Sequence, residues 1–507
     1  MRGNASKHCY WRYPIPAASR PLSRWEKDFF NPGIRSLSPE FKYNVSMLSD
    51  AILGELRQIA GDEYVRTDPD TIRDNSTDAT KRFHPADVVV FVDNADQVSS
   101  ILRLSNRERI PVVSRGGGVG YAGGAIPIAG GIVISMRRMD RILEINPLDL
   151  LAVLEPGVIT DDLQRAVEAK GLFYPPDPAS LKQSTIGGNV AHNAGGPRAF
   201  KYGVTRQYLL GLDVVLPTGE LVHTGGRVVK NAVGYDLTDL MCGSEGTLGI
   251  ITKLTMRLLP KPEAALTVMG LFDSVRSCAN AANALIVDGI IPSKLELIDR
   301  QSLQAIRSYI RDEKIESTVP LPEAANALLL VEVDGNRSAA QTSLECVRSV
   351  LRRTGLEVLE AGDGAELWAI RRYMSPAVGR IRPNKINEDI VVPRSRVPDY
   401  LDAMERLQFE TGIPIVCFGH VGDGNMHVNI MIDAANPKES ALGETAKRRV
   451  FELVVEMGGT ISGEHGIGIM KSEFLPLALQ PEAIAAMKRI KSALDPNNIL
   501  NPGKIFP

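Results

Sequence analysis

The glycine-rich run at residues 114–124, SRGGGVGYAGG, constrains the fold more than any other stretch, because six of its eleven residues are glycine. Glycine takes positive φ at no steric cost and lacks a Cβ, so backbone N–H groups of such a loop can converge on one anion. The loop follows the apolar residues 110–113, which are expected to form a buried strand. A glycine-rich turn is as often only a tight connection, but a pyrophosphate is the natural ligand for this composition.

Two nucleotide-binding patterns compete for this loop. The mononucleotide signature ending in Gly-Lys-Ser/Thr is absent, whereas Gly118, Gly120 and Gly123 have the GxGxxG spacing of a dinucleotide-binding fold. That fold requires a helix directly after the glycines. Residues 125–135, AIPIAGGIVIS, contain a proline, two glycines and a β-branched run, which are typical of a strand rather than a helix. The loop is therefore predicted to lie between strands.

Length and composition limit the possible classes of protein. A chain of 507 residues is too long for one core and suggests two or three domains. The formal net charge of -2 gives no reason to expect nucleic acid or an anionic membrane as the main partner. No apolar run approaches the ~20 residues of a membrane helix, so any membrane contact is expected to be peripheral. The five cysteines are scattered without CxxC spacing, which favours a reducing compartment and excludes a local iron–sulfur cluster.

The first 46 residues are basic and rich in proline, and no acidic residue precedes Glu26. They lack the apolar core of a secretory signal. The simplest interpretation is a disordered leader or a translated extension upstream of Met47. An arginine-rich transit peptide is the alternative, but the prolines interrupt an amphipathic helix.

Hydrophobic periodicity predicts an α+β protein with two regions of different texture. Two further glycine-rich runs, residues 184–196 (STIGGNVAHNAGG) and 242–252 (CGSEGTLGIIT), are read as loops that approach a ligand. In the first region, helices are expected at 49–61, from Asn94 or Asp96 to 107 and at 160–170, with strands at 86–92, 110–113, 131–136, 151–154 and 212–216. Later come strands at 266–272, 294–298 and 328–334 and helices at 273–287, near Ser302, at 339–353 and at 481–494.

Residues 417–429, CFGHVGDGNMHVN, carry a second constellation. If Asp423 and Gly424 form a two-residue hairpin turn, His420 pairs with His427, and their Cβ atoms lie ~5 Å apart on one face. Asn429 points to the same face. Glu464, in the motif SGEHG, would complete a His₂–carboxylate site for a divalent ion with open positions for substrate. The alternative is that these are structural histidines and a turn.

The motifs together resemble those of the FAD-linked oxidoreductases with the vanillyl-alcohol oxidase (PCMH-type) fold, in the branch of D-lactate, glycolate and D-2-hydroxyglutarate dehydrogenases. RGGGVGYAGG, PPDPAS, STIGGNVAHNAGG, GSEGTLGIIT, GHVGDGNMH, SGEHGIG and NPGK stand in the order of that family. The resemblance extends from about residue 50 to the C-terminus. It implies a PCMH-type FAD-binding domain of two subdomains and an antiparallel-sheet substrate (cap) domain with helices on one face.

The resemblance also implies where the cofactor binds. Because positions 116–118 are all glycine, where covalent members carry histidine or cysteine in or near this loop, the FAD is expected to be non-covalent. The residues expected to line it are Arg115, Gly116, Gly117, Gly118, Gly120, Gly123, Gly124, Pro178, Ser180, Thr185, Gly187, Gly188, Asn189, Gly195, Gly196, Glu245, Gly246, Gly249, Ile251 and Asn501.

The same resemblance assigns the reacting groups. His420, His427 and Glu464 match the metal ligands, for Zn²⁺ or Mn²⁺, and His465 matches the base that takes the substrate hydroxyl proton. Arg371, in the motif Trp-x-x-Arg, is expected to bind the substrate carboxylate, assisted by Lys385, with Asn429 as a further catalytic group. The role of Arg372 stays undecided. Residues 378–383, VGRIRP, are closer to the glycolate and lactate relatives than to the hydroxyglutarate ones, so a small substrate is expected.

The sequence thus predicts a metal-dependent FAD dehydrogenase of a small D-2-hydroxy acid, D-lactate or glycolate first. Alternatives are a D-2-hydroxyglutarate dehydrogenase, the FAD subunit of a glycolate oxidase complex, an oxidase that uses O₂, and a non-redox flavin enzyme. The acceptor is expected to be a quinone, a cytochrome, an electron-transfer flavoprotein or a partner subunit, and a homodimer stays open. A cytoplasmic location is expected, peripheral at the inner membrane, or mitochondrial if a transit peptide exists. The predicted domains are 1–46 (leader), 47–262 (FAD), 263–455 (substrate) and 456–507 (return to the flavin site).

Overall fold

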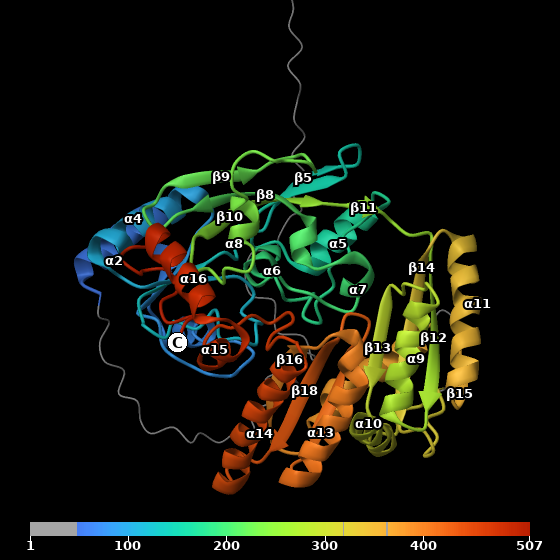
Figure 1. The fold of residues 1–507 in the computed structure, drawn as a ribbon. Coiled ribbons are helices and arrows are strands. Elements are labelled where there is room, and N and C mark those ends of the chain that lie inside the picture. Colours follow the sequence, from blue (N-terminus) through green and yellow to red (C-terminus); the bar gives the residue numbers. More distant parts are fainter. Residues whose placement is uncertain (1–47, 318, 361–363) are drawn as a thin grey trace, which may run out of the picture.

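The computed structural model describes residues 48–317, 319–360 and 364–507, so the expectations for the basic leader lie outside the described residues. Two domains are visible in Figure 1: one coloured blue to green, the other yellow to orange. The red C-terminal segment returns to the first domain. Among the described residues, no helix has both the length and the apolar character needed to cross a bilayer.

The first domain begins with a mostly parallel sheet whose strand order is β1 (Val65–Arg66), β2 (Val88–Phe91), β4 (Ile132–Ser135), β3 (Val112–Arg115). The apolar sides of helices α2 (Asp50–Ala60) and α4 (Ala95–Glu108) share a core with this sheet. Ser49 caps the first of these helices, and of the two alternatives Asn94 and Asp96 it is Asn94 that caps the second. No helix intervenes between β3 and β4, so the glycine loop lies between strands, as expected.

The second subdomain is a five-stranded antiparallel sheet packed against three helices. The two sheets confirm the two-subdomain architecture that the resemblance implies. The strand order is β5 (Ile142–Asn146), β6 (Leu151–Leu154), β10 (Ile250–Arg257), β8 (Leu209–Val215), β9 (Leu221–Gly225), and the helices are α5 (Thr160–Glu168), α6 (Ile186–His192) and α8 (Leu237–Met241).

The prediction that residues 184–196 form a loop is wrong in part, because their central part, Ile186–His192, is helix α6. Thr185 caps this helix by accepting a hydrogen bond from Gly188 N. The glycines permit close packing rather than an irregular backbone: a Cβ on Gly187 would lie 2.5 Å from Pro156 Cβ. Glycine lowers intrinsic helix propensity, which is why composition favoured a loop.

The second domain is built on a seven-stranded, fully antiparallel sheet, as expected. Its strand order is β15 (Glu357–Leu359), β12 (Ala264–Phe272), β14 (Ala327–Gly335), β13 (Lys294–Ile298), β17 (Ile415–His420), β18 (Asn425–Ile432), β16 (Asn384–Val391).

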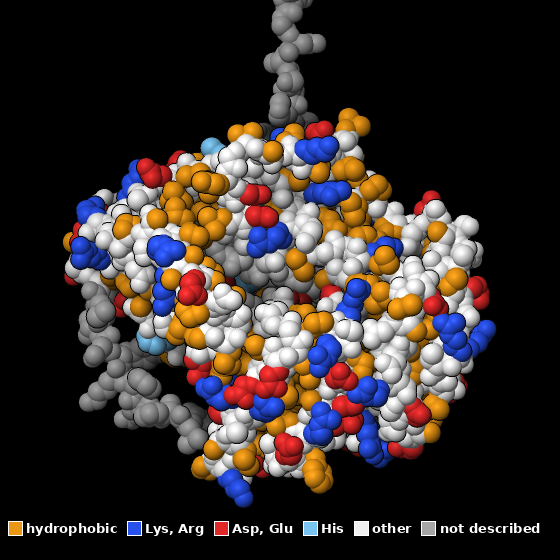
Figure 2. Space-filling view, in the orientation of Figure 1, with side chains coloured by type: hydrophobic (Ala, Val, Ile, Leu, Met, Phe, Trp, Pro, Cys, Tyr) orange, Lys and Arg blue, Asp and Glu red, His pale blue; other side chains and the backbone are white. Residues whose placement is uncertain are grey.

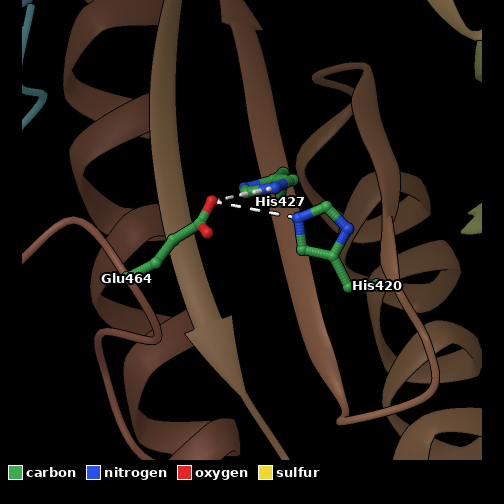
Figure 3. A group of neighbouring side chains, drawn as sticks. All are labelled: His420, His427 and Glu464. Carbon is green, nitrogen blue, oxygen red and sulfur yellow. Dashed lines mark ion pairs between the residues drawn. The ribbon is translucent and has the colours of Figure 1, made fainter. Parts of the chain in front are cut away.

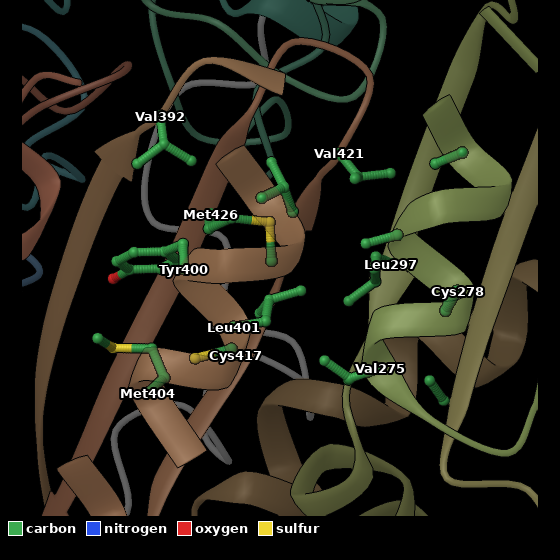
Figure 4. Packing of buried hydrophobic residues seen from close by; sticks show 14 of the residues in the cluster. Val275, Cys278, Leu297, Val392, Tyr400, Leu401, Met404, Cys417, Val421 and Met426 are labelled. Carbon is green, nitrogen blue, oxygen red and sulfur yellow. The ribbon is translucent and has the colours of Figure 1, made fainter. Parts of the chain in front are cut away.

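The expectation of helices on one face of this sheet is wrong in part. One face packs against the four helices α9 (Val275–Val287), α11 (Arg337–Thr354), α13 (Val397–Thr411) and α14 (Pro437–Glu456), a core seen in part in Figure 4. Helices α10 (Arg300–Asp312) and α12 (Ala365–Val378) pack against the other face. The reason lies in the strands: neighbours such as Leu297 and Ile298 are both fully buried, so each face needs a cover.

The C-terminal segment ties the chain end to the first domain. Helix α16 (Pro481–Leu494) has the predicted bounds, and the following tail adds backbone hydrogen bonds from Val112 N to Ile499 O and from Asn501 N to Val112 O. Lys504, which is buried, donates to the carbonyl of Gly123, in the first glycine loop, and to that of Ile126, just after it. The tail is therefore part of the support of that loop.

Candidate functional site

A cavity in the first domain is lined by all three glycine-rich runs. Its wall combines the loop after β3, the N-terminal part of α6 and the segment before β10. Seventeen of the twenty residues expected to contact FAD line it, namely Arg115, Gly116, Gly117, Gly118, Gly120, Gly124, Pro178, Ser180, Thr185, Gly187, Gly188, Asn189, Gly195, Glu245, Gly246, Gly249 and Ile251. The sequence therefore located this cavity correctly, and the assignment of the individual residues to FAD stays a prediction.

The other three, Gly123, Gly196 and Asn501, are absent from this lining and pack behind it. Gly123 has a φ of 77°, and a Cβ there would lie 2.4 Å from Ile469 Cγ1. A Cβ on Gly196 would lie 2.6 Å from Asp177 O. Asn501 donates to the carbonyls of Gly124 and Glu245. These three residues therefore support the cavity wall by packing against it or by hydrogen bonding to it, and they are not part of its surface.

Two cavity residues use their side chains for support. The Arg115 guanidinium donates to Thr77 O at 2.7 Å and Asp74 O at 3.1 Å, so it holds the preceding segment rather than pointing freely into the cavity. The Glu245 carboxylate accepts from Ile467 N and Gly468 N at 2.7 and 2.8 Å. Glu245 therefore connects the third glycine run to the motif SGEHGIG.

Gly120 shows how the loop can hold a cofactor. A Cβ on this residue would meet nothing nearer than His192 Nε2 at 3.9 Å, so a side chain would extend into the cavity. A Cβ on Gly117 would instead lie 2.2 Å from Gln183 O. The loop thus keeps its backbone close to the protein on one side and open on the other. This arrangement fits a flat, anionic dinucleotide such as FAD, held by backbone N–H groups.

The second constellation lies on the face of the large sheet that turns toward this cavity. His420 on β17, His427 on β18 and Glu464 offer ligand atoms that lie within 4.8 Å of one another (Figure 3). Glu464 Oε1 is 3.9 Å from His420 Nε2 and 3.6 Å from His427 Nε2. A tetrahedral ion ~2.1 Å from each ligand holds ligand atoms about 3.4 Å apart, so small side-chain adjustments suffice.

The predicted hairpin register is wrong, although the predicted face is right. His420 pairs with Asn425, and His427 pairs with Phe418, so the turn contains four residues, 421–424, rather than two. The two histidines are diagonal neighbours whose ring centroids are 5.2 Å apart. Because the pairing shifts by an even number of residues, both side chains stay on the same face; a shift by one would have separated them.

Glu296 on β13 is a functional candidate that no motif in the sequence identifies. It is fully buried, pairs with His420 across the sheet and makes a hydrogen bond with His420 Nδ1. Its other oxygen accepts from Arg371 Nε at 2.8 Å. Burial opposes its charge, but His420 and Arg371 hold the pKa of Glu296 below its ordinary value. A hydrogen bond at Nδ1 leaves His420 Nε2 facing Glu464, as metal-binding histidines require.

Arg371 lies beside the histidine cluster and contacts Glu296 and Phe418. Its guanidinium stacks over the Phe418 ring at 4.7 Å, and its Nε is occupied by Glu296. Arg372 donates to Ala365 O on its own helix and is exposed, which favours a structural role. Lys385 is exposed on β16, opposite Met431, and its role stays a prediction.

Asn429 lies two residues beyond His427 on β18, on the same face, as expected. It is fully buried and its Oδ1 accepts from Asn387 Nδ2 at 3.0 Å. Its own Nδ2 and Asn387 Oδ1 have no hydrogen-bond partner among the described residues. This unpaired polar group is consistent with a role in the site, and its assignment as catalytic stays a prediction.

His465 lies where the cavity and the histidine cluster meet. It lines the cavity together with Glu464, and its Nε2 is 3.7 Å from Glu464 Oε1. Its ring lies 5.2 Å from that of Tyr121, in the first glycine loop, and 5.7 Å from that of His427, nearly parallel to both. Burial lowers the pKa of His465 to about 4 and raises that of Glu464 to about 7. A neutral imidazole is the form that accepts a proton.

The face in Figure 2 is hollowed where the two domains meet, and Lys/Arg and Asp/Glu side chains are interspersed over the surface of the second domain. That mixture gives no reason to expect a polyanionic partner on this face.

Comparison with known proteins gives two family matches that together cover most of the chain. Residues 86–225 match the model "FAD binding domain" and residues 261–505 match "FAD linked oxidases, C-terminal domain". The glycolate oxidase subunit GlcD of Bacillus subtilis is 41% identical over 91% of this chain and 97% of its own length. A D-2-hydroxyglutarate dehydrogenase of Stutzerimonas stutzeri is 36% identical over 91% of this chain and 100% of its own. A D-lactate dehydrogenase of Anaerostipes hadrus is 35% identical over 83% of this chain and 89% of its own.

Solved structures support the fold alone. Substrate-bound p-cresol methylhydroxylase superposes with a TM-score of 0.73 at 18% identity, over 90% of this chain and 96% of its own. The 4-ethylphenol oxidase of Gulosibacter chungangensis gives 0.72 at 23% identity, over 90% of this chain and 97% of its own.

Proposed function

The chain belongs to the family of FAD-linked oxidases, and from this premise we propose that it is a metal-dependent dehydrogenase of a small D-2-hydroxy acid. D-lactate and glycolate are the first candidates. The observation that carries the proposal is that Glu464 and His465, one step apart in the chain, belong both to the glycine-lined cavity and to the His420–His427 cluster. A cofactor in the cavity and an ion in the cluster would therefore act on the same small molecule.

The residues divide the chemistry as follows. Bound FAD would supply the acceptor for the hydride that leaves the substrate α-carbon. His420, His427 and Glu464 would hold a divalent ion such as Zn²⁺ or Mn²⁺, which makes a coordinated hydroxyl more acidic. His465 then takes the hydroxyl proton on a ring nitrogen, and its stacking between Tyr121 and His427 limits the orientations of that ring.

The substrate is oriented at its carboxylate. Glu296 accepts from Arg371 Nε, so Nη1 and Nη2 of the guanidinium would bind the substrate carboxylate. Two parallel N–H···O bonds are the usual geometry of such a pair. Lys385, on β16, would assist. We favour a short 2-hydroxy acid because residues 378–383 follow the pattern of glycolate and lactate relatives.

Two alternatives remain within the same chemistry. The similarity to a D-2-hydroxyglutarate dehydrogenase favours a longer substrate with a second carboxylate. The similarity to glycolate oxidase subunit GlcD favours a subunit that works with partner chains. In either case electrons would leave to a quinone, a cytochrome, an electron-transfer flavoprotein or such a partner.

The proposal is tested by anaerobic mixing of FAD-loaded, metal-loaded protein with glycolate, D-lactate, L-lactate and D-2-hydroxyglutarate. We expect fast bleaching of the flavin absorbance by a D-2-hydroxy acid or glycolate and not by L-lactate. Absence of bleaching with every acid would refute the function. Acid precipitation of the same protein should release all FAD, since the first glycine loop has no histidine or cysteine to tether it.

A further inference from the structure

Asp389 is a buried aspartate behind the cluster for which no role has been assigned so far. It lies on β16, pairs with His427 of β18 and has a relative exposed surface of 0%. Since residues that face each other across an antiparallel pair share one side of the sheet, Asp389 and the metal-ligand candidate His427 point to the same face.

One oxygen of Asp389 holds the whole motif SGEH. Asp389 Oδ2 accepts the backbone N–H groups of Gly463 at 2.8 Å, Glu464 at 2.9 Å and His465 at 3.1 Å. It also accepts from Ser462 Oγ at 3.1 Å. Three consecutive amides that converge on one oxygen form the kind of concavity that usually binds a free anion. Here the anion is the chain's own carboxylate.

The other side of Asp389 is also fixed. Its Oδ1 accepts from Asn425 Nδ2 at 2.6 Å, at the start of β18. Lys471 Nζ donates to the carbonyls of Asp389 and Ile461, at 2.8 and 2.7 Å, just before the motif. The carboxylate therefore cannot move toward the loop or away from it without breaking bonds to the sheet.

No regular secondary structure defines the shape of this loop, and Glu245 holds only its later residues, Ile467 and Gly468. Residues 462–468 belong to no helix or strand, and Gly463, Gly466 and Gly468 give the backbone many alternatives. Buried backbone N–H groups need acceptors, and those of Glu464 and His465 donate to Asp389 Oδ2. Their side chains start from these fixed backbone positions.

We propose that Asp389 is a positioning residue whose carboxylate fixes Glu464 and His465 relative to His427, so that the ligand cluster is already assembled before an ion binds. For the consequence on turnover, this inference rests on the proposed function. For metal affinity and loop order it stands on its own.

The test compares Asp389→Asn with a matched control, Asp299→Asn. Asp299 is also buried in the second domain and accepts two backbone amides, those of Ser302 and Cys417, but it does not contact the SGEH motif. Amide hydrogen exchange of the FAD-loaded, metal-free proteins is measured first. We expect at least ~10-fold faster exchange at residues 463–465 in Asp389→Asn and unchanged exchange there in the control, whose own changes are confined to Ser302 and Cys417.

The second readout is metal affinity, measured by calorimetric titration with Zn²⁺ and with Mn²⁺. Asp389→Asn should bind the metal ~10–100-fold more weakly, as found when outer partners of metal ligands are removed, and FAD content should stay normal. At saturating metal its flavin reduction should remain slower than wild type, with little change in KM, because His465 is misplaced.

Unchanged exchange at residues 463–465 in Asp389→Asn, or equal metal affinity of this variant and wild type, would overturn the inference. Equal losses in the Asp299→Asn control would also overturn it, since the effect would then be general destabilisation. A wild type that binds metal but oxidises no hydroxy acid would refute the proposed function and leave these two readouts valid.

Discussion

The glycine-lined cavity and the histidine cluster are built on opposite principles. Backbone forms much of the cavity wall, because side chains are missing at Gly120 and at the other glycines that line it. The cluster is a set of buried and half-buried side chains, which two carboxylates, Glu296 and Asp389, hold in place. FAD binding in the cavity should therefore be lost when a side chain is added, and metal binding in the cluster should be lost when a side chain is removed. The two regions share Glu464 and His465 but would bind their ligands through different groups, so loss of one ligand should leave the binding of the other intact.

The largest effect is expected from the pair Glu464→Ala and His465→Ala. If Glu464 is a ligand, its loss removes metal and activity together, because two histidines alone hold a divalent ion poorly. His465→Ala should keep metal and FAD and slow flavin reduction by ~10²–10⁴, the usual contribution of a positioned base. Metal analysis and rapid-mixing flavin reduction of both variants separate these roles.

The roles assigned to these cluster residues would be wrong if His465→Ala lost its metal or Glu464→Ala lost its FAD. The first outcome would make His465 a ligand, and the second would make the two regions one cooperative unit.

On the cavity side, Gly120→Val should weaken FAD binding about 100-fold, or about 2.7 kcal/mol, while the apoprotein unfolds at the wild-type temperature. The reason is that a Cβ at Gly120 has room on the protein side and fills only cavity. Gly117→Ala is the matched control: its Cβ would collide with Gln183 O at 2.2 Å, so it should lower the apoprotein stability. Flavin fluorescence titration and thermal unfolding of the apoproteins distinguish the two.

Normal FAD affinity in Gly120→Val would show that the cofactor does not approach this part of the loop. Metal affinity of this variant should be unchanged, and a parallel loss of metal would contradict the separation of the two regions.

A smaller effect is expected from Glu296→Gln. Glutamine has one acceptor oxygen, so it cannot serve both His420 Nδ1 and Arg371 Nε. Metal affinity should fall by ~10–100-fold and KM should rise, with FAD content unchanged. Calorimetric metal titration and steady-state kinetics at saturating metal measure the two parts. An unchanged metal affinity would reduce Glu296 to a packing role.

Local sequence signals predicted most of the fold, because helix caps and the bounds of most elements are set by residues within the element itself or next to it. Ser49 and Asn94, both candidates for N-caps, do cap the two helices. The predicted bounds are also those of three elements, Leu151–Leu154, Lys294–Ile298 and Pro481–Leu494. The exceptions involve tertiary contacts. Helix α6 exists in spite of its glycines because Thr185 caps it and Pro156 packs against it.

The site was predictable only as far as motifs reach. The sequence identified the two histidines and their common face, but the four-residue turn depends on pairing across strands that no local pattern specifies. Glu296 and Asp389 were missed for the same reason. They come from β13 and β16, far along the chain from the residues they hold, and each is an ordinary acidic residue in an apolar strand until the sheet assembles.

The most direct test of the central claim, that cavity and cluster form one reaction centre, is flavin bleaching in FAD-loaded protein before and after metal removal. Chelated protein, checked by elemental analysis, is mixed anaerobically with its best 2-hydroxy acid and then reloaded with Zn²⁺ or Mn²⁺. We predict that FAD stays bound throughout, that bleaching is lost on chelation and that it returns on reloading. Full bleaching in verified metal-free protein would contradict the account.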